Sequence, residues 1–127
     1  MIDRRTFFSL AAAGLASSAD SLAQAAPKRI AVVTTIYRYL SHAQHMADSF
    51  LVGYPYDGVW HQPKMKIVSL YVDQHPEGDQ SQERAKEFGF EVYPSIAEAL
   101  RCGGDKLACD AVLLIGDQCL RARNLDT

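Results

Sequence analysis

Four short apolar runs lie along the chain after residue 25, with segments of helical spacing between them. The runs cover residues 30–35, 66–73, 91–93 and 111–116. The first and the last contain β-branched or bulky apolar residues with no polar alternation, which is typical of strands covered on both faces of a parallel sheet. The pattern therefore predicts four strands, and it predicts that the first and fourth are buried.

The segments between the runs carry signals for the start and end of helices. Ser41 with Gln44 and Ser95 with Glu98 each form a capping-box pattern, and a polar helix is expected over residues 80–88, ending at Gly89. Glycines also follow the two other helical segments. The side chains expected to face the sheet are Ala43, Met46, Ala47, Phe50 and Leu51 in the first helix and Ile96, Ala99 and Leu100 in the last.

The order of these elements predicts an α/β fold. Strand and helix alternate as β-α-β-α-β-α-β, which favours a parallel sheet with right-handed crossovers. We expect a Rossmann-like open parallel sheet of about four strands, in the order 3-2-1-4, with helices on both faces. Residues 54–63 carry strong turn signals and predict a loop insertion of about ten residues.

The N-terminal residues resemble an export signal. Arg4 and Arg5 precede Phe7 and Phe8 as in twin-arginine translocation signals, and the apolar stretch that follows is shorter than the ~20 residues that span a membrane. Residues 23–25 match the small-x-small pattern of a cleavage site. We expect residues 1–25 to be removed and the protein to be periplasmic or extracellular. An ordinary secretory signal or a buried helix are the alternatives.

Length and charge bound the remaining chain. Without residues 1–25 it has 102 residues (127 − 25), enough for one domain with its own core. Its net charge of −2 (11 − 13) gives no basic surface for nucleic acid, and no later segment is long enough to span a membrane stably. Cys102, Cys109 and Cys119 match no zinc-binding spacing, and we favour free thiols over a Cys102–Cys109 disulfide.

The second half of the chain resembles a known family. Residues 84–93, 95–100 and 109–115 are similar to the succession of helix, glycine, short strand, short helix and buried strand in Gfo/Idh/MocA-type oxidoreductases. The resemblance covers residues 28–116. It implies that residues 26–116 form a dinucleotide-binding domain with NAD or NADP as cofactor. Residues 117–127 do not resemble the family and are expected to form an atypical tail.

Two departures from the family limit what the resemblance implies. The family's Gly-x-Gly-x-x-Gly turn should fall at residues 34–40, where this chain has no glycine. Those glycines remove the Cβ atoms that would collide with a pyrophosphate. The family's catalytic lysine and its substrate domain are not found either. We expect oxidoreductase activity to be absent or residual, and a non-catalytic binding or interaction module is the competing hypothesis.

Ligands of open α/β sheets bind beyond the carboxyl ends of the strands. Arg38, Ser41 and the first amides of the following helix offer a site for a nucleotide phosphate or another small anion. The alternatives are a solvated Arg38 and a Ser41 that only caps the helix. The candidate cofactor-binding residues are Thr35, Arg38, Ser41, Asp73 and Gly116, with His42, Gln74, His75 and Asp117 around the same crevice.

Asp73 takes the place of the family's ribose-binding acid, as the resemblance implies. It follows Ser41 by 32 residues (73 − 41), whereas the acid usually follows the glycines by ~20 residues. The insertion at residues 54–63 accounts for the surplus. The alternative is an aspartate that caps the turn before Pro76.

Two further interpretations stay open. His42 and His45 have helical spacing suited to a metal ion, with His75 or Asp73 as a third donor, although no family pattern supports a metal. The fourth strand would lie at an edge of the sheet, because no fifth strand follows it. A homodimer, a partner strand or aggregation would cover such an edge.

Overall fold

The computed structural model describes residues 25–117. The expected export signal and all but the first residue of the expected tail therefore lie outside the described residues, apart from Ala25. The elements in chain order are β1 (Lys28–Thr34), α1 (His42–Leu51), β2 (Tyr54–Tyr56), β3 (Val59–His61), β4 (Met65–Val72), α2 (Ser81–Phe88), β5 (Glu91–Val92), α3 (Ile96–Arg101) and β6 (Ala111–Ile115).

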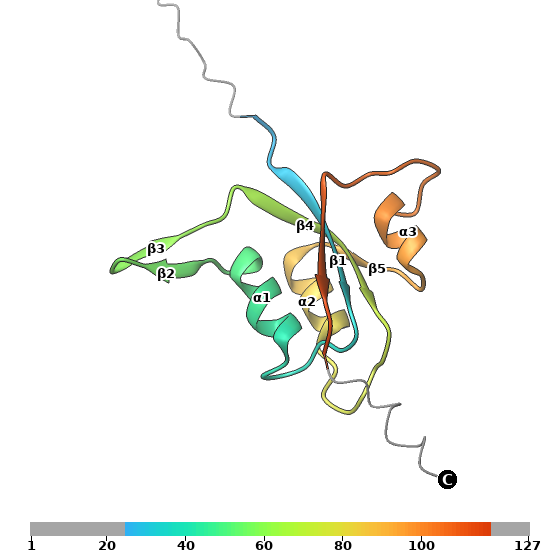
Figure 1. Cartoon of the computed structure of the whole chain (residues 1–127), viewed down its shortest axis with the longest axis horizontal. Helices are drawn as coiled ribbons and strands as arrows, with labels where there is room; N and C mark the ends of the chain where they lie inside the picture. Colours follow the sequence, from blue (N-terminus) through green and yellow to red (C-terminus); the bar gives the residue numbers. More distant parts are fainter. Residues whose placement is uncertain (1–24, 118–127) are drawn as a thin grey trace, which may run out of the picture.

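Four of these strands form one parallel sheet in the order β5-β4-β1-β6 (Figure 1). β1 is central, and its Val32 pairs with Leu70 of β4 and with Leu113 of β6. The structure thus confirms an α/β, Rossmann-like open sheet. Counted over the parallel strands alone the order is 3-2-1-4, and the numbering differs because β2 and β3 form a separate antiparallel pair.

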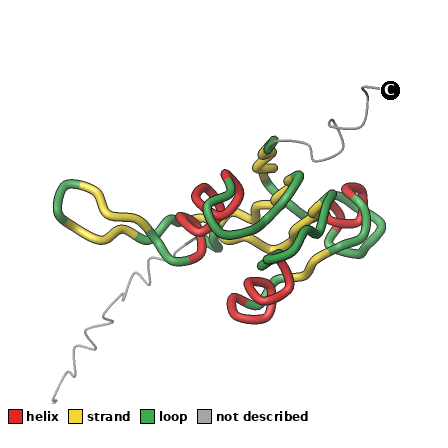
Figure 2. Tube along the Cα trace, turned by 90° about the horizontal axis from the view of Figure 1, so that it is seen from below, coloured by secondary structure: helices red, strands yellow, loops and turns green. Residues whose placement is uncertain are grey.

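Helices cover both faces of the parallel sheet. α1 and α2 lie on one face and α3 lies on the other, as the two views together show (Figure 2). Ala43 and Ala47 of α1 pack with Ile30, Val32 and Leu70 of the strands in one apolar core. Small side chains at these two positions let α1 approach the sheet closely. Among the helices of residues 25–117, none has the length and apolar character needed to cross a membrane.

The helix ends follow the capping signals in the sequence. The Ser41 hydroxyl accepts a hydrogen bond from the Gln44 amide at 3.2 Å, and Ser95 accepts one from the Glu98 amide at the same distance. Gly89 ends α2 in the left-handed conformation with φ of 74°, which glycine adopts without a Cβ clash. Local signals therefore set all three helix ends.

Two apolar helix residues expected to face the sheet do not. Met46 is 45% exposed in α1, and Ile96 is 46% exposed in α3. The sheet contacts of α1 pass through Ala43 and Ala47, so Met46 lies to the side of the contact. Ile96 is the first residue of a six-residue helix and lies at the rim of the sheet.

Residues 54–63 form a β-hairpin, so the expectation of a loop there is wrong. β2 and β3 pair in antiparallel register, and Asp57 and Gly58 connect them with φ of 49° and 73°. Two consecutive residues with positive φ form the turn that suits a tight hairpin. The Trp60 side chain donates to the Val52 carbonyl at 3.0 Å and holds the hairpin to the end of α1. The hairpin projects from the body of the molecule (Figure 1).

β6 is buried on only one face, which corrects the expectation of a fully buried strand. Ile115 faces the core, whereas Val112 and Leu114 are 48% and 75% exposed on the opposite face. The reason is that α3, on this face of the sheet, packs mainly on β1 and β4. The expectation that this strand lies at a sheet edge is confirmed.

Cys102 and Cys109 are free thiols, as the sequence predicts, and both are half-buried. The Arg29 guanidinium donates to the Cys102 sulfur at 3.6 Å and to the Ala108 carbonyl at 2.8 Å. These contacts connect β1 to the segment between α3 and β6. Cys119 lies outside the described residues.

Candidate functional site

A crevice opens at the carboxyl ends of β1, β4 and β6, on the face of the sheet that α3 partly covers. Its volume is about 420 Å³. Ligands of open α/β sheets bind at this end of the strands. Its walls are formed by Val33, Thr34, Thr35, Tyr71, Asp73, Ile96, Leu114, Ile115 and Gly116. The fold thus brings together three of the candidate residues, Thr35, Asp73 and Gly116, from three different strand ends.

The crevice has apolar walls and a polar rim. Val33, Ile96 and Leu114 supply the apolar surface, and the side chains of Ile96 and Leu114 are exposed to solvent. Thr35 and Asp73 supply polar groups where the strands end. An apolar slot with a few convergent polar groups is the usual construction of a small-molecule site. Such a slot suits a flat apolar ring that carries hydroxyl groups at one end.

Asp73 presents an exposed carboxylate at this rim. Its oxygens accept hydrogen bonds from the Tyr71 hydroxyl and from the Gln74 side-chain amide, each at 3.3 Å. Its backbone amide donates to the Thr34 carbonyl at 3.0 Å, which fixes the residue beside the end of β1. An ionised carboxylate has about four lone-pair sites, so it can accept further hydrogen bonds beside these two.

The turn between β1 and α1 is built without glycine. The Thr34 hydroxyl donates to the Ile36 carbonyl at 3.1 Å, and the Tyr37 side chain turns inward and is fully buried. The Tyr37 carbonyl accepts the Gln80 amide at 2.8 Å, which fastens the turn to the start of α2. Leu40 then adopts φ of 61°, a conformation that non-glycine residues rarely take. The turn is therefore anchored by its own side chains.

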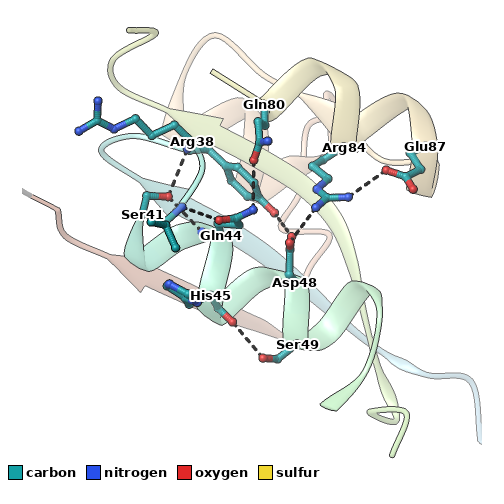
Figure 3. A network of polar contacts seen from close by, with 11 residues as sticks. Arg38, Ser41, Gln44, His45, Asp48, Ser49, Gln80, Arg84 and Glu87 are labelled. Carbon is teal, nitrogen blue, oxygen red and sulfur yellow. Dashed lines mark hydrogen bonds and ion pairs between the residues drawn. The ribbon is translucent and has the colours of Figure 1, made fainter. Parts of the chain in front are cut away.

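A polar network joins this turn to both helices on its face of the sheet (Figure 3). The Tyr37 hydroxyl donates to Asp48 at 2.7 Å, and the Arg84 guanidinium contacts Asp48 at 2.9 Å and Glu87 at 3.0 Å. Gln44 donates to Gln80 at 3.3 Å between the same helices. These residues hold the two helices together and lie away from the crevice walls.

The network changes the acid–base properties of its members. Burial raises the pKa of Tyr37 far above its usual range, and the hydrogen bond and charge of Asp48 raise it further. Burial lowers the pKa of Arg84, but the charges of Asp48 and Glu87 and the hydrogen bond to Glu87 outweigh it, so the net pKa is raised. No pattern in the sequence predicts this network, because its partners are separated by up to 36 residues.

Arg38 and Ser41 do not line the crevice. The Ser41 hydroxyl accepts both the Arg38 amide and the Gln44 amide, each at 3.2 Å, so it acts as a helix cap. The Arg38 side chain is exposed and extends away from the network in Figure 3. Their geometry matches the alternatives of a capping serine and a solvated arginine.

Asp117 occupies the N-terminus of α1. Its carboxylate accepts the His42 amide at 3.3 Å and lies 3.5 Å from the His42 ring nitrogen Nδ1. Its own amide donates to the Thr35 hydroxyl at 3.4 Å. α1 has no acidic residue in its first turn, so Asp117 supplies the negative charge that a helix N-terminus favours. The sequence placed Asp117 near the crevice but did not reveal this contact.

Two of the three histidines considered as metal ligands, His42 and His75, have carboxylate partners. His42 contacts Asp117, and the His75 ring nitrogen Nδ1 lies 2.5 Å from Asp79, which also accepts the Ser81 amide and hydroxyl. Across residues 25–117, no group of three or more His, Cys, Asp or Glu side chains is arranged to hold a metal ion.

Comparisons of the chain with protein-family models, curated proteins and solved structures found no match.

Proposed function

We propose that this chain is a binding protein for an adenine nucleoside. The observation that carries the proposal is the crevice in which Asp73 lies at the rim of an apolar slot between Ile96 and Leu114. The slot takes the flat base, and the carboxylate accepts hydrogen bonds from the ribose hydroxyls. The resemblance to Gfo/Idh/MocA-type oxidoreductases supports this arrangement, since it gives Asp73 the ribose-binding position.

We restrict the proposal to binding rather than to oxidoreductase catalysis. An NAD or NADP molecule needs a site for its pyrophosphate, and in Rossmann folds glycines and free helix amides provide it. Here Tyr37 and its neighbours form the turn, and Asp117 holds the first amide of α1. These contacts favour the nucleoside over the whole dinucleotide. We also propose that residues 1–25 direct export by the twin-arginine pathway to the periplasm or beyond.

Calorimetry with adenosine tests the nucleoside site. Adenosine should bind the full 127-residue chain saturably, and free ribose should bind more weakly because it leaves the apolar slot empty. Asp73→Asn should weaken adenosine binding about tenfold or more, because a charged acceptor is lost. Asp105→Asn, which removes the same charge from an exposed loop, is the control.

Two results would reject the nucleoside site. One is the absence of saturable adenosine binding at millimolar concentration. The other is an adenosine affinity that changes equally in the Asp73→Asn and Asp105→Asn variants, since a general charge effect would then explain the loss.

A second candidate function is self-association through β6. The outer edge of β6 has no strand neighbour within residues 25–117, and its five residues include no charge and no proline. Natural edge strands usually carry such residues to prevent pairing. We propose that a second copy of the chain pairs antiparallel with β6 about a two-fold axis at Leu113. The exposed side chains of Val112 and Leu114 would then contact the same residues of the second copy.

A further inference from the structure

The carboxylate of Asp117 lies directly beside the crevice. Gly116, which precedes it, lines the crevice, and so does Thr35, whose hydroxyl accepts the Asp117 amide. Only 13% of the Asp117 side chain is exposed. A negative charge is therefore held in place where the crevice meets the start of α1.

The start of the helix that follows the first strand is where Rossmann folds hold the phosphate groups of a nucleotide. The first amide of α1 is the nearest helix N-terminus to the end of β1, and Asp117 already accepts its hydrogen bond. A phosphate brought to the same place would lie close to a partly buried carboxylate. Two like charges that lie close together repel more strongly where water is partly excluded, because the effective dielectric constant is lower. The basic side chain of Arg38 in the same turn is exposed and extends away from the polar network in Figure 3.

We infer that Asp117 makes the crevice selective for uncharged nucleosides and excludes ligands with a phosphate on the ribose. The Asp117 carboxylate accepts the hydrogen bond of the first α1 amide, which a ligand phosphate would otherwise accept. The inference rests on the proposed nucleoside site and adds the ligand class: nucleosides are bound, whereas nucleoside phosphates and dinucleotides are rejected. Asp117 is therefore a specificity-determining residue.

The ratio of AMP to adenosine affinity tests this selectivity in the full chain. AMP should bind about tenfold more weakly than adenosine to the unmodified protein. Asp117→Asn keeps an acceptor for the His42 amide but removes the charge, so the affinity for AMP should rise toward that for adenosine. Asp105→Asn should leave the ratio as it is. A ratio that Asp117→Asn does not change would overturn the inference.

A second measurement separates this inference from the nucleoside site itself. Inorganic phosphate is titrated into the ¹⁵N-labelled full chain and into the Asp117→Asn variant, and the His42 amide resonance is followed. We expect a saturable shift in the variant alone. Equal shifts in both proteins, or no shift in either, would contradict the role of Asp117. If adenosine fails to bind but phosphate shifts only the variant, the nucleoside proposal fails and the anion-excluding role of Asp117 stands.

Discussion

Tyr37 shows how one buried side chain anchors the turn between β1 and α1, which contains no glycine. Its ring is buried between the β1–α1 turn and the helices, and its hydroxyl donates to Asp48. The neutral phenol is the form that this environment favours, because burial and the nearby carboxylate both oppose ionisation. Tyr37 is therefore a structural residue whose contribution depends on its proton.

Removing the Tyr37 hydroxyl should alter stability at high pH. The folded-state pKa is raised above the unfolded value of about 10, so the contribution of Tyr37 is complete below pH 10 and is lost as pH rises beyond it. The loss should be about 1.4 kcal/mol per pH unit above that point. In Tyr37→Phe this dependence should be absent, and the loss of the hydrogen bond should lower stability by about 1 kcal/mol near neutral pH.

Urea unfolding between pH 8 and pH 11 measures this dependence. Tyr54→Phe, on the exposed hairpin, is the matched control and should keep the slope of the unmodified protein. A Tyr37→Phe variant whose stability declines as steeply as that control above pH 10 would show that the phenol is not protected by the fold.

At the scale of elements, α1 depends on its cap more than α3 does. Ser41 accepts two backbone amides, those of Arg38 and Gln44. Ser95 accepts one, that of Glu98, and its hydroxyl donates to the exposed Glu98 carboxylate at 3.1 Å. Ser41→Ala therefore leaves one more amide without its side-chain acceptor. We expect Ser41→Ala to lower the free energy of unfolding by about 1 to 2 kcal/mol, and Ser95→Ala by about 1 kcal/mol or less.

Chemical denaturation of the two alanine variants provides the comparison. The expected order of destabilisation is Ser41→Ala first and Ser95→Ala second. The reverse order would mean that the turn before α1 does not rely on the second hydrogen bond to Ser41.

The elements that the sequence predicts correctly are those with local signals. Ser41, Ser95 and Gly89 determine helix ends through contacts within a few residues, so their pattern is enough. The β2–β3 hairpin was not recognised, because Pro55 and the surrounding turn residues outweighed the Asp57–Gly58 signal for a tight turn. Helical spacing also cannot determine which apolar residues a short helix buries. For this reason Met46 and Ile96 were wrongly placed against the sheet.

For the whole molecule, the alternation of strands and helices and the right-handed crossovers between parallel strands predict the sheet. The sheet in turn brings the residues of the site together. Parallel strands end at one edge, so Thr35, Asp73 and Gly116 meet although the first and last are 81 residues apart (116 − 35). Arg38 and Ser41 were expected in the same crevice and lie at the start of α1 instead. The contact between Asp117 and His42 depends on side-chain geometry across the fold, which no sequence pattern in this chain encodes.

The exposed edge of β6 leads to a prediction on assembly. Sedimentation velocity should show a dimer for the unmodified full chain, and Leu114→Lys should shift it to monomer because a charge would be buried at the pairing strand. Leu107→Lys, at an exposed leucine in the loop before β6, is the control and should leave the dimer intact. A monomeric unmodified chain, or equal effects of the two variants, would reject pairing through β6.

The central position of β1 also determines when the sheet can be completed during synthesis. β4 begins 31 residues after β1 ends (65 − 34), whereas β6 begins 77 residues after it (111 − 34). Closing the longer loop costs more conformational entropy, so β1 and β4 can pair first. The other edge of β1 stays unpaired until β6 has left the ribosome. The earliest strand of the sheet is therefore among the last to be fully paired. If residues 1–25 direct export by a route that carries folded proteins, as we propose, export can begin only after β6 has been synthesised and paired with β1.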